Sequence, residues 1–133
     1  MSPTIGFPLF LVITLAFLGG VVATGYAAHR RRHIPLVVCS VISLGITIFF
    51  AERLGHLFDL KATGWIYPFH LALAKTTTLS YLLPVVFGSL TIREPTWLLW
   101  HRRVAYLVLF LTVITAATGA WMLCIAERLP GVS

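Results

Sequence analysis

The chain has 133 residues, of which 59% are hydrophobic and only 11% are charged, and its formal net charge is +6. A mean hydropathy of +0.94 is far above that of a soluble domain of this length, so the composition excludes an ordinary soluble protein and indicates an integral membrane protein. The positive charge would suggest nucleic-acid binding in a soluble protein. In a membrane protein it is explained by the orientation of the loops, and no nucleic-acid partner is expected.

Four apolar runs reach the length of about 20 residues that a helix needs to cross the hydrocarbon layer. The connections after the first and third runs are very short, and short connections make consecutive helices antiparallel neighbours. The sequence therefore predicts an all-α, integral membrane protein with a single transmembrane domain, residues 1–133, built as an up-down-up-down four-helix bundle. The helices are expected near residues 5–28, 34–55, 68–92 and 97–125.

The basic residues are distributed unequally between the two ends of these helices. One side carries Arg53, Lys61 and Arg128, whereas the other carries six arginines. Cytoplasmic loops are enriched in Lys and Arg, so the arginine-rich turns are predicted inside and both termini outside. These arginines are expected to contact lipid headgroups, with the carboxylates of haem propionates or a partner protein as the alternative. They are Arg30, Arg31, Arg32, Arg93, Arg102 and Arg103.

Polar and small residues recur at helical spacing and are expected to mark the faces that pack inward. In the second helix the stripe contains His33, Ser40 and Thr47. In the third helix it contains His70, Thr77, Tyr81, Pro84 and Gly88, and in the fourth His101, Thr112, Thr115 and Gly119. Each of these three stripes includes a histidine, which helix packing alone does not require.

His33 and His101 each lie in the first turn of a predicted helix, on the same side of the membrane. The positive end of the helix dipole disfavours an imidazolium there, and neutral imidazole is the form that ligates a metal ion or haem iron. We therefore expect His33 and His101 to ligate one haem b together. The alternative is that both are polar residues of the interface, which is the role expected for His29.

A second group of ligand types lies toward the outer end of the helices. Glu52 and His56 are four residues apart and share a face of the second helix, at the level where His70 begins the third. Glu52, His56 and His70 are therefore candidate ligands of a metal ion such as copper, and His56 and His70 are also candidates for haem. Because Glu52 and His56 lie well around the helix from the His33 stripe, one continuous stack of sites is disfavoured.

Lys75 is the most deeply placed charge in the sequence. An ionisable residue within a membrane span is a candidate functional residue whose partner should be named. Side chains lean toward the N-terminus of their helix, so Glu52 and Lys75 on antiparallel neighbours would lean toward each other. An ion pair between Glu52 and Lys75 is predicted, with extension of Lys75 to the headgroups as the alternative.

Several short elements carry a resemblance to a known family. They are His33 before "IPLVV", His56 at the end of the second helix, "GWIYPF" before the third, Pro84, and "HRRVAYLVLFLTVITAATGAWML". Over residues 25–125 the chain resembles the short four-helix bacterial membrane proteins of the CtaM/YozB type. The resemblance implies the bacterial cytoplasmic membrane, an assembly or maturation role around haem-copper respiratory oxidases, and histidines that bind haem or metal. The family's histidine in the third helix falls at Lys75, so either His70 takes its role or the site is lost.

Three functions are thus expected as alternatives. The first is a respiratory accessory protein that binds haem b or a metal and serves an oxidase together with other membrane subunits. The second is a stable b-type cytochrome subunit that transfers electrons, and the third is a structural subunit without a cofactor. An enzyme acting alone is not expected, because the sequence shows no nucleophile with a base at usable spacing, no phosphate-binding loop and no CxxCH motif.

Overall fold

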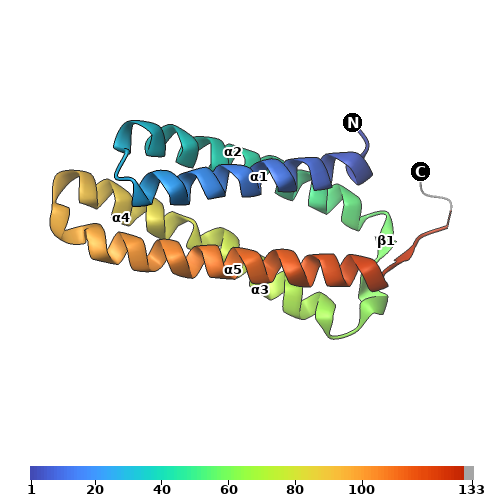
Figure 1. Ribbon diagram of the computed structural model, residues 1–133. Coiled ribbons are helices and arrows are strands. Elements are labelled where there is room, and N and C mark those ends of the chain that lie inside the picture. The colour runs from blue at the N-terminus through green and yellow to red at the C-terminus, as the bar shows by residue number, and fades with distance from the viewer. Residues whose placement is uncertain (131–133) are drawn as a thin grey trace. The chain divides into compact units, whose positions relative to one another are not determined.

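The computed structural model describes residues 1–130, and most of them are helical. The α-helices are α1 (Pro3–Tyr26), α2 (Arg30–Gly55), α3 (Ile66–Ser80), α4 (Leu82–Arg93) and α5 (Leu98–Ile125) (Figure 1). The shorter elements are the 3-10 turns η1 (Lys61–Thr63) and η2 (Pro95–Trp97) and the strands β1 (Phe58–Asp59) and β2 (Glu127–Arg128), which form a two-stranded sheet.

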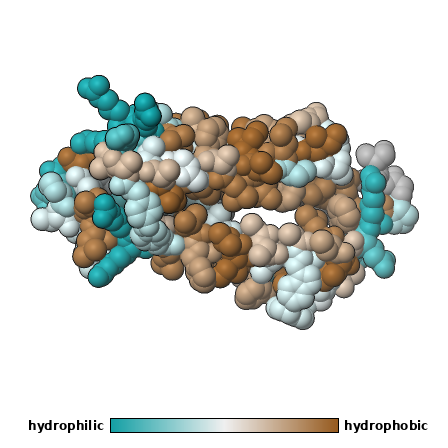
Figure 2. Space-filling model, in the orientation of Figure 1, coloured by the Kyte–Doolittle hydropathy of each residue, from teal (hydrophilic) through white to brown (hydrophobic). Residues whose placement is uncertain are grey.

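Four stretches of these residues are long and apolar enough to cross a membrane, and each overlaps one of the predicted runs; the first ends at Tyr26, two residues before the predicted end. They are Pro3–Tyr26, Arg30–Gly55, Ile66–Arg93 and Pro95–Ile125. Figure 2 shows hydrophobic side chains along the helices and hydrophilic side chains gathered beyond helix ends. Large apolar side chains such as Val12 (64% exposed) and Phe110 (61% exposed) face outward, as expected for helices surrounded by lipid. The predicted all-α chain with four helices able to span a membrane is therefore confirmed for residues 1–130.

The chain divides into two compact units. The first contains Met1–Phe58 and Leu129, and the second contains Asp59–Arg128. The first unit is a hairpin of α1 and α2, in which Gly6 near the start of α1 faces Phe50 near the end of α2. The second unit pairs α3 and α4 with α5. Within the first unit α1 and α2 run antiparallel, and within the second α3 and α4 each run antiparallel to α5.

Helix α2 begins at Arg30, one turn earlier than predicted, and Pro35 lies inside it. A proline cannot donate to the carbonyl four residues before it, which here belongs to Arg31. Arg31 is exposed at the end of the helix, so water can bond this carbonyl. The preceding turn is closed by Ala28, whose φ of 54° lies in the left-handed region.

The third span consists of two helices where the sequence predicted one. Helix α3 ends at Ser80 and α4 starts at Leu82, with Tyr81 between them. Pro84 provides the reason, because it has no N–H to bond the carbonyl of Ser80. The span is therefore interrupted one turn before Pro84 and then continues to Arg93.

The hairpin of α1 and α2 is held by hydroxyl groups near its middle. Thr14 Oγ1 lies 2.7 Å from Ser43 Oγ and 3.0 Å from Thr47 Oγ1, and all three side chains are buried. Thr14 also donates to the carbonyl of Phe10. Because hydroxyl groups in lipid have no water to bond, contacts of this kind join membrane helices.

The second unit has a comparable row of hydroxyl contacts between α3 and α5. Thr77 Oγ1 lies 2.8 Å from Thr115 Oγ1, and the Tyr81 hydroxyl lies 2.8 Å from Thr112 Oγ1. These four residues belong to the two stripes that the sequence predicted to face inward, so that prediction is confirmed. The row fixes the register of α3 against α5.

Candidate functional site

Three histidines each pack against a glycine of the neighbouring helix in their own unit. A Cβ placed on Gly25 would lie 3.5 Å from Cε1 of His33, and one on Gly88 would lie 3.2 Å from Cε1 of His101. The closest case is Gly119, where the distance to Cε1 of His70 would be 2.9 Å. We call each arrangement a histidine–glycine contact. The missing Cβ lets the imidazole lie directly against the neighbouring backbone.

The Nδ1 atoms of His33 and His101 are bonded to backbone carbonyls of the neighbouring helix. His33 Nδ1 lies 3.1 Å from the carbonyl oxygen of Val21 and 3.2 Å from Thr24 Oγ1. His101 Nδ1 lies 3.0 Å from the carbonyl oxygen of Pro84. Val21 and Pro84 each precede the contacted glycine by four residues. The two histidines thus use the same backbone position relative to the glycine.

These partners determine which ring nitrogen carries the proton when the imidazole is neutral. A carbonyl can only accept, so the Nδ1 atoms of His33 and His101 carry the proton. Nε2 then carries the lone pair.

His70 reaches the same state through a hydroxyl. Its Nδ1 lies 2.9 Å from Thr118 Oγ1, and the Thr118 hydroxyl donates to the carbonyl of Thr115 at 3.1 Å. The Thr118 oxygen therefore accepts from Nδ1 of His70, which again places the lone pair on Nε2. Thr115 precedes Gly119 by four residues. The carbonyl at this position therefore bonds His33 and His101 directly in their contacts, and it is linked to His70 through the Thr118 hydroxyl.

This arrangement is the one by which proteins hold a histidine ligand. An Nδ1–H donated to a backbone or side-chain oxygen orients the ring and raises the basicity of Nε2, which binds the metal or haem iron. His33, His70 and His101 are each partly buried, so the rings are held by their surroundings and are not fully covered. In His33 and His101, Nε2 is therefore the nitrogen that would bind such a group.

The sequence contains a signal for these contacts. Gly88 follows His70, and Gly119 follows His101, by 18 residues, which is five turns of 3.6 residues and returns to the same helix face. In addition, "ATG" occurs three times, and two of these copies end at Gly25 and Gly119. Gly88 and Gly119 were expected on inward faces, but their pairing with particular histidines was not predicted.

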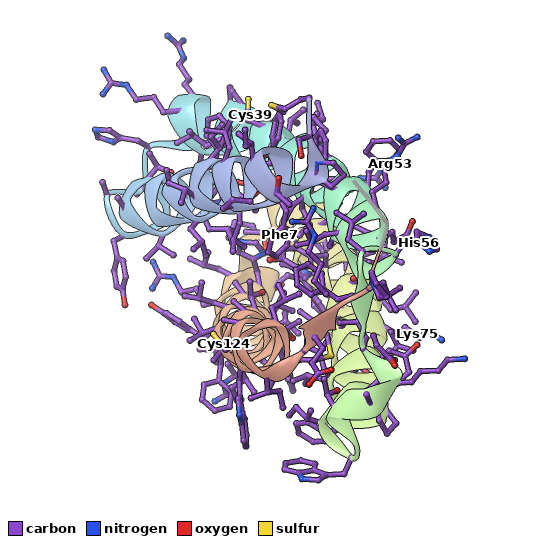
Figure 3. The ribbon with its side chains drawn as sticks, turned by 90° about the vertical axis from the view of Figure 1, so that its right-hand side faces the viewer. Phe7, Cys39, Arg53, His56, Lys75 and Cys124 are labelled. Carbon is purple, nitrogen blue, oxygen red and sulfur yellow. The ribbon has the colours of Figure 1, made fainter. Side chains whose placement is uncertain are left out.

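The other end of the first unit is packed with aromatic rings. Phe7 precedes Gly25 by 18 residues, so it occupies the position that His70 occupies relative to Gly88. Beside it, a Cβ on Gly6 would lie 2.6 Å from the ring of Phe50, which stacks on Phe10 with ring centroids 5.6 Å apart. Phe7 projects from α1 in Figure 3. This end of the hairpin is closed by aromatic packing.

The predicted outer ligands lie at exposed positions. Glu52 and His56 are exposed at the end of α2, and Figure 3 shows His56 and Arg53 pointing away from the hairpin. Within either unit, residues 1–130 bring no three His, Cys, Asp or Glu side chains together to hold a metal ion. The set of Glu52, His56 and His70 draws on both units and stays a prediction.

Lys75 is also exposed, and its side chain extends away from α3 (Figure 3). Its predicted partner Glu52 belongs to the first unit. The ion pair between them therefore stays a prediction, as does the joint ligation of one haem by His33 and His101, which lie in different units.

The arginines lie at the turns beside two of the histidine–glycine contacts. Arg30, Arg31 and Arg32 line an open recess together with Ala28 and His29. Arg102 and Arg103 follow His101 directly, and the Arg103 guanidinium lies 5.6 Å from the centre of the Trp100 ring. Both groups are exposed and can meet anionic groups such as lipid phosphates or propionates.

A scan against protein-family models finds no match to the chain, and searches of the curated proteins and of the solved structures find none either. The resemblance to the CtaM/YozB type therefore stays a prediction from the sequence.

Proposed function

We propose that this chain is a small multi-pass membrane protein that binds haem b through His33 and His101 and serves a respiratory oxidase as an accessory protein. In this proposal the four spans form an up-down-up-down bundle in a bacterial cytoplasmic membrane, with the arginine-rich turns inside and both termini outside. The observation that carries it is the orientation of the imidazole rings. Each has Nδ1–H bonded to a carbonyl four residues before a contacted glycine, and hence a lone pair on Nε2.

The positions of the two histidines within their helices support the same conclusion. His33 is the fourth residue of α2, and His101 is the fourth residue of α5. Each histidine therefore lies in the first turn of its helix. An ordinary interfacial histidine would need neither this position nor a fixed tautomer.

The kind of ligand set favours haem over copper. A protein site for a bare metal ion usually gathers three or four side-chain ligands, whereas haem brings four porphyrin nitrogens and needs only one or two axial residues. Within residues 1–130, no three His, Cys, Asp or Glu side chains come together, so each oriented histidine stands apart from other ligands of these types. When bound, haem would supply one-electron redox chemistry.

The remaining residues have defined roles in this proposal. The carbonyls of Val21 and Pro84 orient the rings of His33 and His101 and hold the proton on Nδ1. The arginines at the turns would meet the propionates, and otherwise the lipid headgroups: Arg30, Arg31, Arg32, Arg102 and Arg103. Service to an oxidase rests on the sequence resemblance, and co-purification with oxidase subunits from the host membrane tests it.

Haem content of the purified protein is the deciding experiment. The full chain should be isolated in detergent and assayed as the pyridine haemochrome, with elemental analysis for copper on the same sample. We expect haem b in the wild type, and a lower haem content in both His33→Ala and His101→Ala. His29→Ala is the matched control, because His29 lies in the same turn and is exposed. A wild type without haem, or full haem in both variants, contradicts the proposal.

A further inference from the structure

The hairpin of α1 and α2 carries two recesses on its surface. One is the recess at the turn, lined by residues 28–32, with a volume of about 410 Å³. The other is a groove of about 190 Å³ between the two helices. Both belong to the first unit, so the packing of the hairpin itself fixes where one lies relative to the other.

The recess at the turn carries positive charge that nothing in the hairpin neutralises. Its lining includes the first three residues of α2, Arg30, Arg31 and Arg32. Glu52 is the only acidic residue among residues 1–58, and it lies 21 residues after Arg31 in the same helix. At a rise of 1.5 Å per residue this is about 32 Å, well beyond the range at which charges interact through salt solution. The recess is therefore complementary to an anion.

The backbone of the turn adds a donor to these charges. The N–H groups of Arg30 and Arg32 bond the carbonyls of Ala28 and His29, whereas the N–H of Arg31 bonds no backbone carbonyl within residues 1–130. N–H groups at the start of a helix point outward along its axis and commonly bond phosphate oxygens. Guanidinium groups bond the same oxygens. The recess thus offers the two kinds of donor that bind phosphate.

The groove is apolar and suits a hydrocarbon chain. Ser43 contributes to its lining, but the hydroxyl of Ser43 lies 2.7 Å from Thr14 Oγ1 and is bonded there. The other lining side chains are spaced three and four residues apart on each helix: Phe10, Ile13 and Phe17 from α1, and Cys39, Ile42 and Ile46 from α2.

One face of α2 leads from the recess to the groove. Val38 follows Arg31 by seven residues and Ile42 follows Val38 by four, so the three side chains share a face of the helix. Val38 is 51% exposed and Ile42 is 59% exposed. Ile42 lies about 16 Å along the helix from Arg31, which is close to half of the hydrocarbon layer of about 30 Å. An anion in the recess and a chain in the groove can therefore belong to one lipid of a single leaflet.

We infer that this face of the hairpin binds one anionic phospholipid, with its phosphate in the recess and one acyl chain in the groove. The inference goes beyond the proposed function, because it requires neither haem nor the two histidines proposed to bind it. A zwitterionic phospholipid has the same chains, but its cationic group would meet the three guanidinium groups. The site therefore selects a negatively charged headgroup.

Lipid binding by the purified full chain tests the recess. The protein should be stripped of lipid in detergent and given phosphatidylglycerol or phosphatidylcholine with identical acyl chains, and native mass spectrometry should count the bound lipid. We expect one phosphatidylglycerol per chain and weaker binding of phosphatidylcholine. Arg30→Gln combined with Arg31→Gln should weaken phosphatidylglycerol binding about 25-fold, roughly 5-fold for each arginine. Arg53→Gln combined with Arg93→Gln is the matched control, because it removes the same charge outside the recess and should leave binding unchanged.

Two measurements test the groove. Ile42→Trp should fill it and weaken phosphatidylglycerol binding although the arginines are intact, whereas Val12→Trp should not, because Val12 is exposed outside the groove. Cys39 lines the groove and is exposed, so it reports occupancy directly once Cys124 is replaced by alanine. Phosphatidylglycerol should slow the reaction of Cys39 with N-ethylmaleimide, and phosphatidylcholine should slow it less.

The outcomes decide the inference without reference to haem. Selective binding of phosphatidylglycerol that protects Cys39, with both effects lost in the Arg30→Gln and Arg31→Gln double variant, supports it. Equal binding of the two phospholipids overturns it, as does an equal loss of binding in the Arg53→Gln and Arg93→Gln control. Bound phosphatidylglycerol that leaves the reaction of Cys39 unchanged also overturns it, because the groove then holds no chain. A wild type without haem contradicts the proposed function alone.

Discussion

Gly119 and His70 lie so close that any side chain on the glycine would displace the imidazole. The Cβ of an alanine would stand 2.9 Å from Cε1 and 3.4 Å from Nε2 of the ring, whose Nδ1 is bonded to Thr118 of the same helix as the glycine. Gly119→Ala should therefore lower the free energy of unfolding by about 1 to 3 kcal/mol, the usual cost of overpacking. Thermal unfolding in detergent measures this change.

Gly45 provides the control for this substitution. It also lies inside a helix, but a Cβ added to it would have no atom within 4 Å. Gly45→Ala should be neutral or should stabilise α2 by up to about 1 kcal/mol, through the higher helix propensity of alanine. Equal stability of the two variants would contradict the close contact at His70.

The hydroxyl contacts of the first unit lead to a second prediction. Thr14→Val removes the oxygen that Ser43 and Thr47 approach, and the Ser43 hydroxyl then loses the partner it has in the hairpin. Hydrogen bonds between membrane helices contribute about 0.6 kcal/mol on average and about 1.7 kcal/mol at most, so a loss in this range is expected. Unfolding of the two proteins by a denaturing detergent measures the difference.

Ser89→Ala is the matched control for Thr14→Val. Ser89 is exposed, and its hydroxyl bonds the carbonyl of Val85 in its own helix. The substitution should leave stability unchanged. If Ser89→Ala cost as much as Thr14→Val, the contacts between helices would not be the source of the effect.

A single substitution in the turn between α1 and α2 should raise the melting temperature of the protein. Ala28 has a φ of 54°, which costs a residue with a Cβ roughly 1 to 2 kcal/mol relative to glycine. Ala28→Gly should therefore raise the melting temperature, although the greater freedom of glycine in the unfolded chain offsets part of the gain. Ala27→Gly should lower it, since Ala27 has a φ of −74°. A gain in both variants would refute the explanation by backbone strain.

The orientation in the membrane that the distribution of the arginines predicts can be tested by labelling. Both native cysteines, Cys39 and Cys124, are exposed and should first be replaced by alanine. A thiol probe that cannot cross the membrane should then label Lys61→Cys in intact cells and leave Arg31→Cys unlabelled. The opposite pattern would reverse the assignment of inside and outside.

Hydropathy predicted the spans because about 20 consecutive apolar residues have few alternatives to a helix across lipid. It did not predict the break at Tyr81, since Pro84 could equally have begun a helix or kinked one. The inward stripes were visible as recurring hydroxyl groups, of which Thr77 and Thr115 now form a pair. Apolar residues cover all sides of these helices, so sequence periodicity could not show which glycine each histidine would meet.

The roles of the polar residues near the predicted outer helix ends were harder to predict from the sequence, for a physical reason. Glu52, His56 and Lys75 are long or polar side chains near helix ends, where reaching the headgroups and binding a partner require the same residue types. His70 differs from them because its ring is fixed by Thr118 and Gly119. The fixed tautomer, which depends on contacts between helices, distinguishes a candidate ligand from an interfacial residue.

The hydroxyl groups of Thr14, Ser43 and Thr47 bond one another within the first hairpin, and this has a consequence for biogenesis. The ribosome releases α1 and α2 before the rest of the chain, and a polar group entering lipid alone carries an energetic cost. Since the partners of Thr14 lie on α2, the two helices can leave the translocon together with these hydroxyls already paired. The N-terminal hairpin can thus be integrated into the membrane while α5 is still being synthesised.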